Sequence, residues 1–566
     1  MNNFLKFLVI AALLTACETN SYDDGSEAPA GRGHTHLWGA ALVITEPPTC
    51  ARAGHGIRVC AIDQTHTEPV DIDPLGHIVA NWTPYRTATA TRDGEDTGYC
   101  NREGCDNKDV LQFNGEYATG TPGLAFELIN GDTEYRVRKG SVTSGQVYIP
   151  AMHRADADSP YLHVTEIGAA GDVYPIGAFY NTNITSVRIP EGVRYIGHHA
   201  FMNCHSLTNV TIPASLTSVG SSVFAVCDAL SAVTFATGCQ LKTFGPYMFS
   251  GCTSLTGITI PASITEIGRD AFNGCDQLRT VIFAADNRLE KIVNAAFMRC
   301  TSLTRITIPA SVTEIGFEAF HRSGLTTVTF EEGSRLEIIG DYAFEQSKIT
   351  AITIPASVTE IAGSAFSSCT SLRSVIFEEG TKLKSMGSFA YSKITSITIP
   401  AGVTNSLYGA FDGCASLANI NVEANNPSYT GRRGILYNKD KTILIAWPTA
   451  SGDITIPAGV TSIGNHAFED CWTLTGVTIP EGVMSIGGGA FLGCYYITDI
   501  TIPASVTSIG QFEFASWQPW QTIYVKGHAS EEEADAAWGT NWRYHSQEFG
   551  DNSGATIKYW NGTSYE

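Results

Sequence analysis

The sequence is poor in charged residues, and the charges that it has are mostly negative. Asp, Glu, Lys and Arg make up 16% of the 566 residues, with 35 basic against 56 acidic side chains and a formal net charge of −21. Such a surface repels phosphate backbones, so no nucleic-acid partner is expected. The hydrophobic fraction of 43% is ordinary. This fraction argues against general disorder and leaves enough apolar residues for a large core or several domains.

Motifs of catalysis are also missing. The chain has no G-x-S-x-G, no H-E-x-x-H, no phosphate-binding loop, and no G-x-G-x-x-G between a strand and a helix. We therefore predict a protein that is not an enzyme and that has no cofactor, no catalytic residues and no metal site.

Long apolar runs are absent beyond the first residues of the chain. Residues 7–14 are apolar and follow Lys6, a run too short to span a bilayer but typical of a signal peptide. The run leads into Leu-Thr-Ala-Cys, which ends at Cys17 and resembles the bacterial lipobox. The resemblance implies that residues 1–17 are a lipoprotein signal peptide and lipobox and that Cys17 is lipidated, the alternative being an ordinary signal peptide. Two or three acyl chains give stable anchoring, and residues 18–33 are predicted to be a polar tether.

Residues 34–110 form two related segments, predicted to be small β modules that contain Cys, His and Trp. Trp38, Gly54 and Cys60 of the first segment recur as Trp82, Gly94 and Cys100 in the second. The pattern resembles a small module of H-x-W, Cys, Gly and Cys found in many bacterial surface proteins, and the resemblance does not say what it binds.

Four cysteines in these modules are candidate disulfide partners: Cys50, Cys60, Cys100 and Cys105. After export they would meet an oxidising compartment. Three pairings are possible, and we favour Cys50–Cys60 with Cys100–Cys105. Zinc binding is the alternative, but the spacing of His and Cys matches no closed tetrahedral site well.

One pattern then fills most of the chain. An aromatic residue, usually Phe after Ala, recurs every 20 to 25 residues, with one gap of 57 between Phe411 and Phe468. Such a period predicts a solenoid. The aromatic residues are assigned to Phe179, Phe201, Phe224, Phe249, Phe272, Phe297, Phe320, Phe344, Phe366, Tyr391, Phe411, Phe468, Phe491 and Phe514.

A single copy of the pattern already indicates its structure. Ile258 and Ile260 alternate with Thr259, which predicts a short strand with one apolar face. Pro261 has no amide hydrogen and ends the strand, and Gly268 marks a turn. One copy cannot cover its own apolar face, so neighbouring copies must stack, with isoleucine on isoleucine and phenylalanine on phenylalanine.

The consensus L-x-x-I-x-I-P…I…IG…AF…C closely resembles the BspA-like, treponemal-type leucine-rich-repeat family of bacterial surface proteins. The resemblance covers about residues 120–566. It implies a right-handed leucine-rich-repeat solenoid, a place on the cell surface, a role in adhesion, and no catalytic residues within the repeat. The predicted fold is therefore a β-rich repeat solenoid at residues 166–525, with β-hairpin caps and small N-terminal β modules.

Caps are predicted at both ends of the solenoid, and an insertion within it. Residues 111–165 are expected to form an N-terminal β-hairpin cap around an Asn-Gly-Asp turn. Residues 526–566 are expected to form the C-terminal cap, with a helix that begins at Ser530 and stops at Gly539. The gap of 57 residues holds two apolar stretches around Asn-Lys-Asp-Lys, which predicts a hairpin insertion at about 430–450 that protrudes from the solenoid.

Nine cysteines recur three residues after the aromatic position: Cys204, Cys227, Cys252, Cys275, Cys300, Cys369, Cys414, Cys471 and Cys494. We predict core packing, because cysteine behaves as a small buried hydrophobe; occasional disulfides or a row of metal ligands are the alternatives. Other copies have Thr182, Ser323, Ser347 or Trp517 there, and the copy assigned to Tyr391 is interpreted as shortened at this position.

The free positions of the repeat are candidates for contact with a partner. Outward-facing threonines recur along the strands, which suits both a flat pleated surface and a polar contact face. The candidate contact residues are Arg305, Thr307, Thr259 and Thr353 in the strands, and Tyr437 and Trp447 in the hairpin. For the two aromatic residues, packing on the solenoid is the alternative.

These observations predict a non-catalytic protein that is lipid-anchored in the bacterial cell envelope, on the outer membrane, and exposed at the surface. Its expected partners are the membrane, through the anchor, and an extracellular protein or cell-surface ligand on host matrix, host cells or other bacteria. A glycan-binding or nutrient-capture module is one alternative, suggested by Tyr437, Trp447, Trp517 and Trp520. A purely structural envelope protein is the other alternative.

Overall fold

The structure is a computed structural model that describes the chain in two compact units. One unit comprises residues 1–119 with 154–159, and the other residues 120–153 with 160–566. Strands at 38–46, 54–60, 67–72, 79–86 and 95–100 are described by their backbone alone. Residues 120–565 are described apart from 157–158, 160–161, 173, 175, 515 and 543–553. Cys17, the tether, Cys50 and Cys105 lie outside the described residues, and nothing is described of the side chains of Cys60 and Cys100.

The first unit contains antiparallel strands. β1 (Trp38–Glu46) pairs with β2 (Gly54–Cys60), which pairs with β3 (Thr67–Ile72). Separately, β4 (Val79–Arg86) pairs with β5 (Glu95–Cys100). Each of the two predicted modules thus has β structure.

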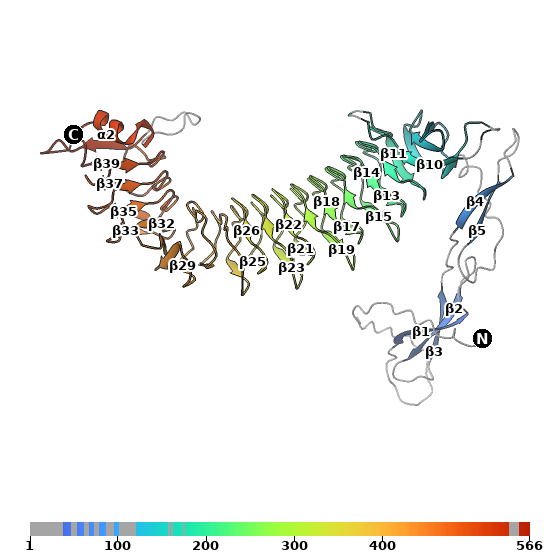
Figure 1. Ribbon diagram of the computed structural model, residues 1–566, viewed down its shortest axis with the longest axis horizontal. Coiled ribbons are helices and arrows are strands. Elements are labelled where there is room, and N and C mark those ends of the chain that lie inside the picture. Colours follow the sequence, from blue (N-terminus) through green and yellow to red (C-terminus); the bar gives the residue numbers. More distant parts are fainter. Residues whose placement is uncertain are drawn as a thin grey trace, which may run out of the picture. The chain divides into compact units, whose positions relative to one another are not determined.

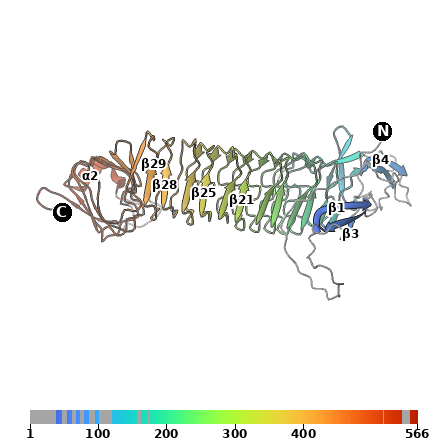
Figure 2. The same cartoon turned by 90° about the horizontal axis from the view of Figure 1, so that it is seen from below.

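The second unit is a parallel β-solenoid of about 15 turns, which confirms the predicted fold. Each regular turn, called a coil here, contributes one longer and one shorter strand, and the strands of successive coils lie side by side (Figures 1 and 2). The longer strands are β8 (Ser144–Tyr148), β11 (Asn183–Arg188), β13 (Asn209–Ile212), β15 (Ala232–Phe235), β17 (Gly257–Ile260), β19 (Thr280–Phe283), β21 (Arg305–Ile308), β23 (Thr327–Phe330), β25 (Ala351–Ile354), β27 (Ser374–Phe377), β28 (Ser396–Ile399), β29 (Asn419–Val422), β33 (Gly452–Thr455), β35 (Leu474–Thr478), β37 (Asp499–Ile502) and β39 (Thr522–Val525).

The shorter strands form a second row, mostly of two residues each. They are β10 (Leu162–Ile167), β12 (Tyr195–Ile196), β14 (Ser218–Val219), β16 (Thr243–Phe244), β18 (Glu266–Ile267), β20 (Lys291–Ile292), β22 (Glu314–Ile315), β24 (Ile338–Ile339), β26 (Glu360–Ile361), β34 (Ser462–Ile463), β36 (Ser485–Ile486) and β38 (Ser508–Ile509). In this row β16, β18, β20, β22, β24 and β26 pair in sequence order as one parallel sheet.

Equivalent residues stack on one another from coil to coil, as predicted. In the longer row Ile258 pairs with Val281, and in the shorter row Ile267 pairs with Ile292. The aromatic rings form a parallel stack, with Phe272 and Phe297 5.1 Å apart between centroids and 4° apart in plane. Five of these six side chains are buried and Val281 is half-buried, because each coil covers the apolar face of the next.

The assignment of Tyr391 to the aromatic stack is wrong. Phe389 occupies that position, stacks on Phe366 at 5.4 Å, and is fully buried, whereas Tyr391 is 41% exposed. The backbone explains the difference, because the second residue after each stacked Phe has a positive φ, as in Asn203 (60°) and Tyr391 (58°). The copy is therefore not shortened, and Ser392 occupies its cysteine position.

The N-terminal cap is a hairpin, as predicted. β6 (Ala125–Ile129) and β7 (Glu134–Arg138) form an antiparallel pair around the Asn-Gly-Asp turn. β7 also pairs in parallel with β10. The short β9 (Met152–His153) also pairs with β10.

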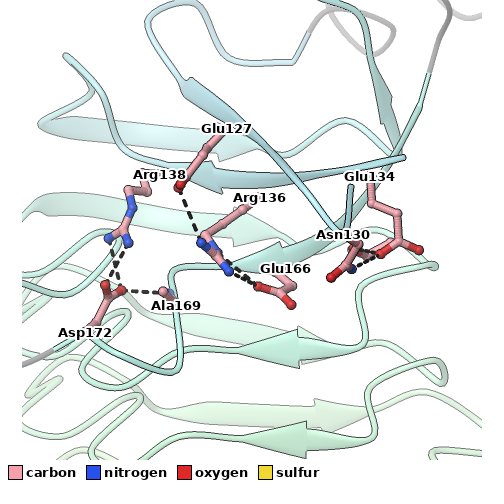
Figure 3. Close-up of polar contacts among 9 residues, drawn as sticks. Glu127, Asn130, Glu134, Arg136, Arg138, Glu166, Ala169 and Asp172 are labelled. Carbon is pink, nitrogen blue, oxygen red and sulfur yellow. Dashed lines mark hydrogen bonds and ion pairs between the residues drawn. The ribbon is translucent and has the colours of Figure 1, made fainter. Parts of the chain in front are cut away.

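Two arginines of β7 fasten this cap to the first coil (Figure 3). Arg136 donates from Nε and Nη2 to Glu166 at 2.9 and 2.7 Å, and Arg138 donates to both oxygens of Asp172 at 3.0 and 2.7 Å. Asp172 also accepts a hydrogen bond from the Ala169 amide, so its carboxylate holds the turn of the first coil as well.

The C-terminal cap also has the predicted elements. Helix α2 (Glu531–Trp538) has Ser530 as its N-cap and ends at Gly539, whose φ is 82°. It is followed by the short η1 (Thr540–Trp542), and β40 (Thr556–Tyr559) adds a last parallel strand to β39.

The hairpin in the long gap is built into the solenoid and does not protrude from it, which corrects the prediction. β30 (Tyr429–Arg432), β31 (Ile435–Asn438) and β32 (Ile443–Ala446) are antiparallel neighbours, and β32 then pairs in parallel with β34 of the shorter row. In the turn of this hairpin coil, Trp447 takes the position of the stacked Phe. The Trp447 amide donates to the Ala467 carbonyl, just as the Phe468 amide donates to Ala490. The gap of 57 residues therefore contains one additional coil.

Candidate functional site

The outward face of the longer strands, called the strand face here, is uncharged over most of its length. Its central row has one exposed residue per coil: Thr211, Thr234, Thr259, Ile282, Thr307, Thr329, Thr353, Ile376 and Thr398. The predicted contact residues Thr259, Thr307 and Thr353 lie in this row, and Arg305 lies exposed beside it on β21. The structure thus gathers these four residues on one face.

The central row combines hydroxyls with unprotected apolar surface. Thr307 and Thr329 lie opposite each other, with 2.9 Å between their hydroxyl oxygens. Ile282 and Ile376 are 53% and 56% exposed, although the neighbouring strands pair them with threonines. A flat surface of this composition can offer both hydrogen bonds and apolar contact to a protein partner.

The two hairpin residues are placed differently from the strand residues. Tyr437 is 5% exposed and belongs to the core around the hairpin, so it is not part of an exposed contact surface. Trp447 is half-buried, and its ring lies 6.0 Å from Phe468 as the stand-in for a stacked Phe. For both residues, packing on the solenoid is what the structure shows.

The cysteine row has a polar role that the sequence did not reveal. Eight of the nine thiols donate to the carbonyl of the Phe one coil earlier, as Cys300 does to Phe272 at 3.2 Å, and Cys471 donates to the Trp447 carbonyl instead. Trp517 makes the same bond from Nε1 to the Phe491 carbonyl, at 3.0 Å. The cysteine position of the repeat therefore favours residues that can donate a hydrogen bond while buried.

The same burial makes these thiols unreactive. All ten cysteines of the described coils are buried and free. Burial raises the pKa of Cys369 and of Cys414 to about 11, so neither is a thiolate at neutral pH.

Exposed aromatic residues gather in the last three coils. Each lies in the turn that follows the cysteine position, where earlier coils have residues such as Asp228, Thr253, Thr301 and Ala415. They are Trp472, Tyr495, Tyr496 and Trp520, with exposed fractions of 51%, 40%, 64% and 58%. Of the aromatic residues named from the sequence, Trp520 is in this group, whereas Trp517 is buried.

The hairpin coil is shorter than its neighbours in one turn. In the next coil, five positions separate Ile463 from Phe468, whereas only three separate the paired Leu444 from Trp447. The two missing residues leave a notch, across which the coil before the hairpin reaches the coil after it. A Cβ at Gly464 would lie 2.5 Å from Cε1 of Tyr408, so that ring crosses the notch.

Three potential metal ligands meet in the notch. Asp412 comes from the coil before the hairpin, and His466 and Glu469 come from the coil after it. One ligand atom from each lies within 4.8 Å of the others. The His466 Nδ1 hydrogen-bonds the Glu469 carboxylate and lies 3.9 Å from Oδ2 of Asp412. The two carboxylates are 15% and 12% exposed, and the imidazole is 41% exposed.

The electrostatics of this cluster reflect an excess of acid. Burial, with the negative charge of Glu469 next, raises the pKa of Asp412 to about 8. The hydrogen bond to Glu469, with Asp412 nearby, raises the pKa of His466. No pattern in the sequence indicates this cluster, because Asp412 and His466 are 54 positions apart and belong to no common motif.

Comparison with known proteins identifies the repeat. The model of the "BspA type Leucine rich repeat region" matches residues 175–291, 290–418 and 449–542, in 6 copies and over more than half of the chain. No curated protein sequence matches the chain.

Several of the similar solved structures are bacterial leucine-rich-repeat proteins. A leucine-rich repeat protein from Bacteroides ovatus is 25% identical, with 72% of this chain and 98% of that chain covered and a TM-score of 0.50. A leucine rich cell surface protein from Faecalibacterium prausnitzii is 23% identical, with 78% and 94% covered and a TM-score of 0.34. The leucine rich repeat protein of T. pallidum is 21% identical, with 48% and 98% covered and a TM-score of 0.29. In the part of the chain that the structure describes, no helix is long and apolar enough to cross a membrane.

Proposed function

This chain belongs to the BspA-type leucine-rich-repeat family, and we propose that it is a non-catalytic surface protein whose solenoid mediates adhesion or protein–protein interaction. The family supports an interaction scaffold in general terms. The more specific proposal is adhesion to host matrix, host cells or other bacteria.

The observation that carries the proposal is the strand face. It is long, continuous from coil to coil and almost free of charge, with threonine hydroxyls and two isoleucines more than half exposed. Solenoids use extended faces of this kind for binding, because the repeat places the same type of contact at each step. These side chains point outward because the core lies on the other side of each strand.

We propose that the protein is held at the bacterial outer membrane by a lipidated Cys17 and a tether at residues 18–33. The apolar run and the lipobox-like motif in the sequence support this location. Replacement of Cys17 by Ala is expected to release the protein from the membrane fraction of cells. Continued partition of the variant into detergent would contradict the anchor.

The strand face is tested by adding charge to it. The triple variant Thr259→Arg, Thr307→Arg and Thr353→Arg places three large cations on the central row. We expect it to lose at least tenfold in affinity for the matrix protein, epithelial cell or bacterium that the wild-type protein binds.

A matched control has the same three substitutions on another surface. Thr253, Thr301 and Thr370 are exposed threonines that directly follow cysteines of the repeat. Their change to Arg should leave binding unchanged. Equal loss in both triple variants, or no saturable binding by the wild-type protein, would contradict the proposal.

A second candidate function is recognition of glycans by the aromatic residues of the last three coils. Trp472, Tyr495, Tyr496 and Trp520 expose ring surface in equivalent turns of consecutive coils. Aromatic residues of this kind supply contact area and a polar edge to a ligand. Replacement of Trp472 and Trp520 by Ala should abolish signals on a glycan array, while a wild-type protein without any signal would remove this candidate.

A further inference from the structure

The notch beside the hairpin coil has features of a binding site that no regular coil shares. Two carboxylates and one imidazole converge there, and they come from coils that are separated by the hairpin coil. A regular coil offers a direct comparison, since His321 and Glu345 lie one coil apart with 3.0 Å between Nδ1 and Oε2. That pair has one base and one acid from two successive coils, whereas in the notch His466 pairs with Glu469 of its own coil and Asp412 is added.

The additional carboxylate has no Lys or Arg partner among the described residues, and it shares His466 with Glu469. None of Asp412, Glu469 and the adjacent Asp470 has an ion pair with Lys or Arg among the described residues; the ion pairs of Asp412 and Glu469 are both with His466. Asp470 instead accepts a hydrogen bond from Nε1 of Trp472 at 3.2 Å. Carboxylates that are mostly buried need a partner of opposite charge, and a bound cation can be that partner.

We propose that Asp412, His466 and Glu469 bind one divalent ion of a first-row transition metal, with Zn²⁺ as its test ion. Zinc takes nitrogen and oxygen ligands at about 2.0–2.2 Å, which places the donors of a tetrahedral site about 3.4 Å apart. The donor atoms here lie within 4.8 Å of one another, so small rotations of the side chains bring them to that geometry. Three protein ligands leave the fourth position open to water or to a partner's side chain.

The donor set selects the class of metal. Imidazole suits zinc and its first-row neighbours, whereas calcium prefers six to eight oxygen ligands. Only two carboxylates and one imidazole are available in the cluster. Calcium is therefore expected to bind weakly.

The ion would also have a structural consequence. The core of the solenoid consists of two clusters that meet at the hairpin, one containing Phe411 and the other containing Phe468. The amide of Phe411 has no backbone hydrogen bond to the next coil in the described part of the chain, whereas the amide of Phe468 donates to Ala490 at 2.9 Å. A metal ion held by Asp412 on one side and by His466 and Glu469 on the other would join the two parts where the ladder of hydrogen bonds is broken.

The experiment is a titration of the full metal-free chain with Zn²⁺, followed by calorimetry and by thermal unfolding. The wild-type protein should bind one equivalent more than the variants Asp412→Asn and Glu469→Gln, or bind it at least tenfold more tightly. Its unfolding temperature should rise with Zn²⁺, and this rise should be absent in both variants. Other His and Cys residues of the chain contribute the same background in each protein.

Two control variants match the test variants in residue type and in position within the coil. Glu345→Gln changes the residue that follows the stacked Phe344, as Glu469 follows Phe468, and His199→Asn changes the residue equivalent to His466. Both should keep the zinc equivalent. Circular dichroism of each variant without metal checks that the fold is retained, and the Asp412→Asn change keeps the side-chain shape.

Three results would overturn the proposal. Equal zinc binding by wild type, Asp412→Asn and Glu469→Gln would show that the cluster is only an ion pair between His466 and its two acids. Loss of the zinc equivalent in the controls as well would place the metal elsewhere. Stabilisation by Ca²⁺ but not by Zn²⁺, dependent on Asp412, would contradict the class of metal.

Discussion

The coils around Phe297 and the coils around the hairpin bury their aromatic residues in different ways. Phe297 lies between Phe272 and Phe320, with centroid distances of 5.1 and 5.3 Å and nearly parallel rings. Phe411 is equally buried but has no ring contact in the described part of the chain, and the next coil offers Trp447 in place of Phe. Stacking on identical neighbours therefore stabilises the regular coils. At the hairpin coil, the two flanking coils instead contact each other through residues that are particular to them.

The difference teaches where a repeat protein can acquire individual features. In a regular coil each residue meets its own counterpart, so charges of one sign would accumulate along a row and neutral residues are favoured. The notch places Asp412 beside His466, two residues that occupy different positions of the repeat. A break in the register therefore brings together groups from different positions of the repeat.

The largest effect is expected from removal of a stacked ring. Phe297→Ala deletes a fully buried side chain and two ring contacts, and it should lower the free energy of unfolding by about 4 kcal/mol. Phe411→Ala should cost about 1 kcal/mol less, because it loses no ring contact. Denaturant titrations of both variants measure the difference, and equal losses would show that stacking adds nothing to burial.

A smaller effect is expected where coils approach most closely. A Cβ at Gly340 would lie 2.7 to 2.9 Å from backbone atoms of Gly316 and Phe317. Gly340→Ala should therefore cost about 2–3 kcal/mol, since the backbone of the preceding coil must shift.

Gly464 is the matched position beside the notch. There the nearest obstacle to a Cβ is the ring of Tyr408, and of the three nearest atoms one belongs to the backbone, the Leu444 carbonyl oxygen at 2.9 Å. Gly464→Ala should cost less than Gly340→Ala, because the ring of Tyr408 can rotate away. Thermal unfolding of the two variants side by side tests this, and the reverse order would contradict the notch.

The last repeat coil departs from the regular one in charge, and its effect depends on pH. Glu513 replaces the alanine that precedes the stacked Phe, is fully buried, and accepts a hydrogen bond from the Ala490 amide at 3.0 Å. Burial raises the pKa of Glu513 well above its ordinary value, while the hydrogen bonds from the amides of Ala490 and Gly489 oppose the rise.

A raised pKa in the folded state means that folding favours the protonated acid. Stability from this group is complete below the pKa of the unfolded chain and falls as pH rises towards the folded pKa, by about 1.4 kcal/mol for each pH unit. Glu513→Gln should remove this fall. Unfolding of both proteins between pH 4 and pH 8 measures it, and parallel pH profiles would contradict the role of Glu513.

The smallest effect is expected in the cysteine row. The Cys300 thiol donates to the Phe272 carbonyl at 3.2 Å, whereas Cys471 lies 3.4 Å from the Trp447 carbonyl oxygen and 3.7 Å from that of Pro448. Cys300→Ser should retain about 1 kcal/mol more stability than Cys300→Ala, because it keeps a donor for the carbonyl.

The same pair of changes at Cys471 should differ less, since its hydrogen bonds are longer. Ser323, Ser347 and Ser392 already occupy this position in three coils, which supports the tolerance for serine. Chemical denaturation of the four variants gives the comparison, and no difference between Ser and Ala at Cys300 would show that the thiol acts by its volume alone.

The repeat pattern was sufficient to predict the solenoid and both caps. Alternation around Thr259 defines a strand with one buried face, and the period of the Phe residues requires that face to meet the next copy. The capping residue Ser530 and the Asn-Gly-Asp turn act locally, so the helix and the hairpin that they define could be predicted without the tertiary structure. The ion pairs of Arg136 and Arg138 with the first coil could not, because they join residues 30 and 34 positions apart.

By itself the sequence determined the length of the regular coils, the repeating residues of their core and the uncharged row on the strand face. These features repeat, so one copy explains all of them. The tertiary structure alone decided that Phe389 joins the aromatic stack, that the hairpin is part of a coil, and that Asp412 lies near His466 and Glu469. The physical reason is that an insertion breaks the equivalence of copies, and the path of the chain through it then decides which residues meet.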